Sequence, residues 1–285
     1  MPARSFPSGE EHDFSADLIP GLDESGTAAR GPDGDADPTA DSGADDGPPV
    51  GHEPDSADDS YWALSRTPLT SLAFALPLVL AYEGGVLLLG RGSARNGADV
   101  WLRQALDGLG FGQYFLLPVL TVVGLLAWHH VRHDRWRFSP AVLLGMWVEC
   151  VVLAMLLVGL ARLQSRLWPL SIGDGMAAVG ARFVGYCGAG LYEEVLFRLL
   201  MLPAVTWACG RFGAAPGAAV AWSVMITSVA FSAAHYVGPL GDTFDLHSFA
   251  FRTLAGLFFA VLFLARGFGI AAGTHAAYDM IVGLF

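Results

Sequence analysis

The sequence predicts an all-α protein: a polytopic membrane helical bundle of about seven spans with a disordered N-terminal tail. Hydrophobic residues make up 53% of the 285 residues, and the mean hydropathy is +0.47. This composition is too apolar for an ordinary soluble domain. Apolar runs that are long enough to cross a hydrocarbon core of about 30 Å also recur along most of the chain.

The first segment, residues 1–60, differs sharply in composition from the rest. It is rich in Asp, Gly, Pro, Ser and Ala and has almost no aromatic residues. Because such a segment buries too little apolar surface to fold, we expect a disordered acidic tail before a transmembrane domain at residues 61–285. The tail holds most of the acids behind the formal net charge of −11. Since nothing resembles a basic stripe, the sequence argues against a nucleic-acid partner.

The first predicted span covers residues 69–90. Thr67 is expected to cap it, and Pro68 occupies the first helical position, where a missing N–H costs nothing. Glu83 is an ionisable residue inside this span. We interpret it either as a partner of other functional groups or as an acid that faces the mouth of the bundle.

A short helix and a second span are expected next. Asn96 and Gly97 predict a turn, and Asp99 is expected to cap an amphipathic helix of about ten residues that lies on the membrane. The second span covers residues 112–128. The loop at residues 129–137 mixes three arginines with three histidines, and because arginines repel a cation we interpret it as a cytoplasmic anchor rather than a metal site.

The remaining predicted spans cover residues 140–162, 176–203, 218–235, 249–264 and 269–284. No internal repeat is detectable, so the inverted-repeat architecture of many transporters is not indicated. These features predict an integral, multi-pass protein of the lipid bilayer, in the cell membrane if the host is a prokaryote.

The fourth of these seven spans carries the charges around which the chain is organised. Each charge inside a span costs roughly 2.5–3.5 kcal/mol on insertion scales, so a helix that only crossed lipid would not keep them. Glu194 and Arg198 are spaced i,i+4 and can pair, whereas Glu193 points about 100° away. A structural ion pair is one interpretation of these residues. Because two adjacent acids share one cation, one acid stays unpaired, and this favours a role in a reaction.

Two later spans carry histidines at the same helical spacing, Phe231 with His235 and His275 with Asp279. Ionisable residues within spans tend to face the bundle interior and one another. We therefore expect two histidines and three carboxylates to converge. Such a group can bind a divalent metal, or it can position and deprotonate a water molecule.

The three motifs, EExxxR, FxxxH and HxxxN/D in this order on successive spans, resemble the CPBP (Abi) family. That family includes type II CAAX prenyl endopeptidases and bacteriocin-immunity proteins, and the resemblance covers residues 69–285. It implies an intramembrane endopeptidase whose substrate is a peptide or a membrane-associated protein, CAAX-type substrates included.

The resemblance also implies a role for each motif residue. Glu193 would be the general base and His235 its partner. Glu194 and Arg198 would form a supporting pair, and His275 with Asp279 would form the oxyanion or metal end.

The last motif position departs from some members, which have Asn there. Asp279 cannot donate a hydrogen bond unless it is protonated, but it can bind metal or orient His275. This departure favours a weak divalent-metal site, zinc for example, on His235, His275 and Glu193. A metal-free mechanism in which Glu193 is itself the base remains the other possibility.

Other protein classes fit the sequence less well. HExxH and a GxSG elbow are absent, and the Tyr278-Asp279 pair has no GxGD partner on a later span. A non-proteolytic immunity or scaffolding protein of the same fold is the main alternative, and a transporter with a proton relay is a third. The intact set of candidate catalytic residues favours the endopeptidase.

Overall fold

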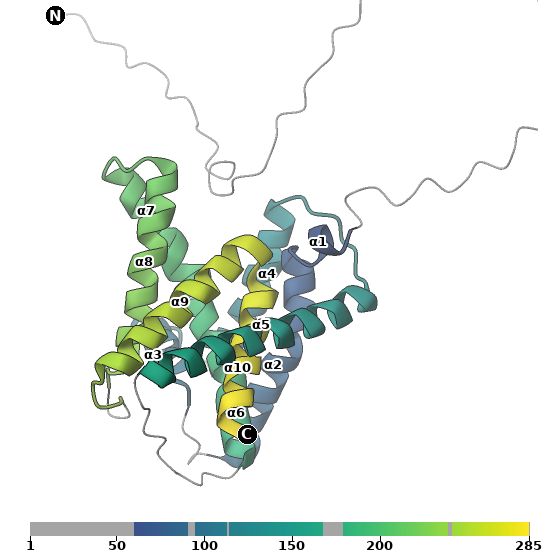
Figure 1. The fold of residues 1–285 in the computed structure, drawn as a ribbon. Coiled ribbons are helices and arrows are strands. Elements are labelled where there is room, and N and C mark those ends of the chain that lie inside the picture. Colours follow the sequence, from purple (N-terminus) through teal and green to yellow (C-terminus); the bar gives the residue numbers. More distant parts are fainter. Residues whose placement is uncertain (1–59, 91–94, 113, 168–178, 239–240, 285) are drawn as a thin grey trace, which may run out of the picture. The chain divides into compact units, whose positions relative to one another are not determined.

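The description that follows rests on a computed structural model, shown in Figure 1. The described residues are 60–90, 95–112, 114–167, 179–238 and 241–284. All of them lie in the unit Pro54–Phe285. The predicted acidic tail lies outside the described residues, apart from Ser60.

Every regular element of the described residues is helical. In chain order the elements are α1 (Tyr61–Leu64), α2 (Pro68–Leu89), α3 (Gly97–Gly108), α4 (Leu116–Val131), α5 (Pro140–Leu167), α6 (Val179–Gly188), the π-helical segments η2 (Ala189–Glu193) and η3 (Val195–Met201), α7 (Leu202–Arg211), α8 (Pro216–Ala234), α9 (Leu246–Arg266) and α10 (Phe268–Leu284). The predicted all-α class is therefore confirmed for this part of the chain.

Four helices of the described residues are long and apolar enough to cross a membrane: α2, α5, α8 and α9. The predicted second span is the 16-residue α4, and the predicted seventh is the 17-residue α10. The predicted fourth span falls on an uninterrupted helical run, residues 179–211, whose winding changes from α to π and back to α across α6, η2, η3 and α7. The prediction of about seven spans is therefore not confirmed, since four helices of the described residues are long and apolar enough to cross a membrane.

Helix α10 packs against many elements of the bundle, since α2, α5, α6, α9 and η2 all contact it. In Figure 1 it lies among these helices. Gly190 of η2 allows a close approach, because a Cβ there would lie 2.6 Å from the Ala276 backbone nitrogen. A larger residue at Gly190 would push α10 away from η2. The tight contact places the motif residues of both helices side by side.

Helix α3 differs from its prediction at its N-terminus. Asn96, not Asp99, is the N-cap, and its side chain accepts a hydrogen bond from the Ala98 N–H. Asp99 lies in the first turn and is fully buried, between Arg95 and Arg103 at 2.5 and 2.6 Å. The sequence predicted an amphipathic helix that lies on the membrane; in the structure its charges pair with one another, with Asp99 fully buried and the two arginines partly buried.

Polar contacts link α1, α5 and α9 in a cluster that we call the clasp, made of Tyr61, Ser65, Glu149 and Arg266. Arg266 makes a bidentate pair with Glu149, at 2.7 and 2.8 Å, and donates to the Ser65 hydroxyl at 2.9 Å. The Tyr61 hydroxyl also donates to Glu149. Burial and the neighbouring carboxylate raise the pKa of Tyr61 to about 12, so the hydroxyl keeps its proton near neutral pH. The Arg266 guanidinium further covers the Trp62 ring, 4.1 Å from its centroid.

We expect Glu149→Ala to lower the free energy of unfolding by about 3 kcal/mol, because it leaves the largely buried Arg266 without its partner. Thermal unfolding in detergent measures this loss. Asp242→Asn is the matched control, since it breaks the more exposed Arg252–Asp242 pair and should cost about 1 kcal/mol or less. Equal losses in the two variants would contradict a structural role for the clasp.

Candidate active site

The EExxxR motif lies where two π-helical segments meet. Glu193 is the last residue of η2, Glu194 lies between the segments, and Arg198 lies within η3. Single π-helical turns are rare and occur frequently at functional sites. The sequence predicted a plain α-helix here, because no residue pattern distinguishes the wider winding.

Glu194 is held from two sides in the interior of the bundle. Its Oε1 atom lies 3.2 Å from the Arg198 guanidinium and 2.7 Å from Nδ1 of His275. Arg198 also donates to the Gly256 carbonyl oxygen of α9 at 3.0 Å. Glu194 is fully buried and Arg198 is 1% exposed. The i,i+4 pair predicted from the sequence is therefore present, and it reaches α9 and α10 as well.

Glu193 presents one of its two carboxylate oxygens to both histidines. Its Oε2 atom lies 3.9 Å from Nε2 of His235 and 3.9 Å from Nε2 of His275. Its Oε1 atom accepts a hydrogen bond from the Asn96 side-chain amide at 2.8 Å. Oε2 is buried and has no hydrogen-bond partner among the described residues. It is therefore the oxygen available for chemistry.

The partners of the two imidazoles assign their tautomers. Nδ1 of His235 lies 2.9 Å from the Phe231 carbonyl oxygen, which can only accept, so Nδ1 carries the proton. Nδ1 of His275 faces the Glu194 carboxylate in the same way. In the neutral form of each ring, Nε2 then presents a lone pair towards Glu193.

Asp279 completes the group, because its Oδ2 atom lies 3.6 Å from Nε2 of His275. The structure thus brings together all six residues singled out from the sequence, namely Glu193, Glu194, Arg198, His235, His275 and Asp279.

The distances between the acceptors suit a proton donor that bridges them. A water molecule that hydrogen-bonds at about 2.8 Å can reach two atoms that are 3.9 Å apart. Zinc requires a tighter arrangement, since ligands at about 2.1 Å in a tetrahedron lie roughly 3.4 Å from one another. Among the described residues, no group of three or more His, Cys, Asp or Glu is placed to hold a metal ion. These residues as placed do not fit an ion, and the predicted metal site stays a prediction.

Aromatic rings pack against the two histidines. Phe259 of α9 stacks on His275, with ring centroids 4.4 Å apart. Phe231 packs edge-on against both imidazoles, at 5.1 and 5.7 Å, and the Arg198 guanidinium lies 4.6 Å from the centroid of its ring. The i,i+4 spacing in the FxxxH pattern therefore has a physical role here, because Phe231 packs against both rings. Phe259 gave no sequence signal, since it is one apolar residue among many on α9.

Glu83, predicted to be a partner or a mouth-facing acid, belongs to a separate network beside the site. It accepts hydrogen bonds from the Tyr192 hydroxyl at 2.7 Å and from Arg103 at 2.8 Å. Tyr192 precedes Glu193 in the chain, so this network holds the backbone next to the candidate base. Asn96, which does contact Glu193, was expected only to form a turn.

One comparison with known proteins relates this site to a family. Residues 175–281 match the family model described as Type II CAAX prenyl endopeptidase Rce1-like, whereas no curated protein and no solved structure matches the chain. The matched segment contains all three motifs, and the four long apolar helices indicate an integral membrane protein. Residues 175–281 of this chain are therefore similar to a CAAX protease-like family.

Proposed function

We propose that this chain is a multi-pass intramembrane endopeptidase that hydrolyses a peptide bond of a membrane-associated protein, CAAX-type substrates included. Glu193 acts as the general base and His235 as its partner. The observation that carries the proposal is the position of Glu193 Oε2, which is 3.9 Å from Nε2 of both histidines and lacks a hydrogen-bond partner among the described residues. The match to an endopeptidase family model supports the same reaction class.

The proposed reaction begins with a water molecule between Glu193 and His235. Glu193 takes a proton from this water as its oxygen forms a bond to the carbonyl carbon of the substrate. The proton then passes from Glu193 to the amide nitrogen as the C–N bond breaks. The products are a new carboxyl group and a new amine, so atoms and charges balance without any further reactant.

His275 is proposed to stabilise the oxyanion that forms during the attack. Glu194 lies on one side of its ring, and Asp279 lies beside Nε2 on the other. Two carboxylates stabilise an imidazolium, and in this charged form Nε2–H is a hydrogen-bond donor. Asp279 need not donate in this arrangement, since its role is to stabilise and orient His275.

The supporting residues keep this geometry fixed. Arg198 neutralises Glu194, and the rings of Phe231 and Phe259 exclude water from the side of His275 that faces the bundle. A low-dielectric surrounding strengthens the electrostatic interactions on which the oxyanion depends.

Reconstitution of the full chain into liposomes with a library of membrane-anchored peptides tests the proposal. We expect cleavage at a defined bond, seen by mass spectrometry as two products whose masses sum to that of the peptide plus one water. Folded protein that cleaves no peptide of the library would contradict the endopeptidase proposal and favour the immunity or scaffolding alternative.

The same assay tests the metal prediction. Because none of the proposed steps runs through an ion, we expect the cleavage rate to persist after treatment with a chelator and dialysis. Loss of cleavage that added Zn²⁺ restores would instead support the weak divalent-metal site on His235, His275 and Glu193 predicted from the sequence.

A further inference from the structure

We infer that Asn96 is a positioning residue for the general base: its side-chain amide holds Glu193 so that Oε2 faces the two histidines. The inference rests on the proposed function, and it assigns a role to a residue outside the segment 175–281 that matches the family model. Its basis is the hydrogen bond of 2.8 Å from Asn96 Nδ2 to Glu193 Oε1.

The orientation of the Asn96 amide follows from its partners. Its Oδ1 atom accepts from the Ala98 backbone N–H at 2.8 Å as the N-cap of α3. Since a backbone N–H can only donate, the oxygen of the amide must face Ala98 and the NH₂ group must face Glu193. One side chain therefore caps a helix and fixes the candidate base at the same time.

The backbone of Asn96 is itself firmly held. Its N–H donates to the Tyr82 hydroxyl at 3.1 Å, and that hydroxyl donates to Asp99 at 2.9 Å. Arg95 and Arg103 both pair with Asp99. These contacts tie the start of α3 to α2, so the amide has little freedom to move away from Glu193.

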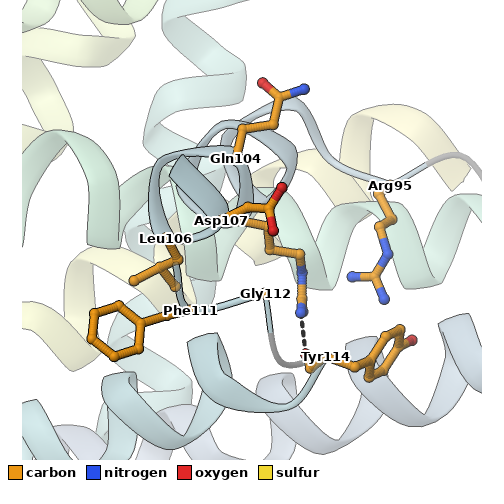
Figure 2. A pocket seen from close by; sticks show the side chains of 8 residues that line it. Arg95, Gln104, Leu106, Asp107, Phe111, Gly112 and Tyr114 are labelled. Carbon is orange, nitrogen blue, oxygen red and sulfur yellow. Dashed lines mark hydrogen bonds between the residues drawn. The ribbon is translucent and has the colours of Figure 1, made fainter. Parts of the chain in front are cut away.

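Figure 2 shows side chains that line a pocket beside α3, Gln104, Leu106 and Asp107 of α3 among them. The pocket has a volume of about 300 Å³. The guanidinium of Arg95 lies over the Tyr114 ring (Figure 2), 4.8 Å from its centroid. Arg103 donates to the Tyr114 carbonyl oxygen. The pocket therefore borders the contacts that hold Asn96.

Loss of the amide would leave Glu193 Oε1 without its donor in a buried setting. The carboxylate would then turn to find other partners, and Oε2 would leave the position shared by the two imidazoles. A misplacement of about 1 Å can cost roughly 10²-fold in rate. We expect the loss in kcat rather than in KM, because Asn96 acts on Glu193 and not on the substrate.

Asn96→Ser separates the two roles of the side chain. Serine is as good an N-cap as asparagine, so α3 should stay capped, but a hydroxyl at this position is too short to reach Glu193. We expect kcat to fall by about 10–100-fold, with KM and the thermal unfolding midpoint close to the wild-type values. Gln104→Ala is the matched control, since it removes an exposed amide from the same helix.

Each outcome in the liposome cleavage assay decides the inference. Wild-type kcat in Asn96→Ser would overturn it, and so would a kcat loss that merely follows a loss of thermal stability. Glu193→Gln, measured in the same assay, separates a failure of the role of Asn96 from a failure of the proposed function. If Glu193→Gln is inactive while Asn96→Ser is fully active, only the role of Asn96 fails; if Glu193→Gln is fully active, the proposed function fails.

Discussion

Glu193→Gln is expected to reduce the rate of peptide cleavage by about 10²–10⁴-fold without unfolding the protein, because it removes the group that takes the proton from water. The substitution preserves shape: the amide oxygen of Gln can still accept from Asn96, while its NH₂ group would face the two histidines and cannot act as a base. Cleavage of a peptide in liposomes measures the loss, and thermal unfolding confirms that the variant is folded.

Asp107→Asn is the matched control for this experiment. It makes the same change from acid to amide at an exposed position of α3, so its cleavage rate should equal that of the wild type. A wild-type rate in Glu193→Gln would remove Glu193 from the role of general base.

Arg198→Met is expected to cause the largest loss of stability, about 3–5 kcal/mol, because it leaves the fully buried Glu194 carboxylate without its cation. It also removes the donor to the Gly256 carbonyl oxygen. Cleavage should fall in parallel, since Glu194 orients His275. Thermal unfolding and the cleavage assay measure the two effects on the same preparations.

The double variant Arg198→Met/Glu194→Gln tests the cause. A neutral amide costs less to bury than an unpaired carboxylate, so the double variant should recover part of the stability lost in Arg198→Met. If Arg198→Met instead has normal stability but no turnover, Arg198 acts in the chemistry and not as the partner of Glu194.

The motif spacing predicted much of the site because helical periodicity is local. The i,i+4 spacing predicted that Glu194 lies beside Arg198. The tendency of charged residues in spans to face one another predicted that His235 and His275 lie near Glu193. In the structure these groups lie 3.2–3.9 Å apart. Their roles in a reaction stay a proposal.

The contacts that the sequence did not reveal are those between residues far apart in the chain. Asn96 and Glu193 are separated by 97 positions, and only the packing of α3 against η2 brings them together. Asp99 looked like a cap because an acid before an apolar run is typical of one, yet its buried pairs with Arg95 and Arg103 outweigh that preference. The π-helical winding at Glu193 has no sequence signature either.

The most direct test of the central claim is the single-turnover cleavage rate of the double variant Glu193→Gln/His235→Ala beside the two single variants. If Glu193 and His235 act on the same water molecule, removing the second residue costs little once the first is gone. We therefore predict that both single variants lose cleavage and that the rate of the double variant stays close to that of the slower one. Rate losses that multiply in the double variant, or wild-type rates in both single variants, would contradict the account.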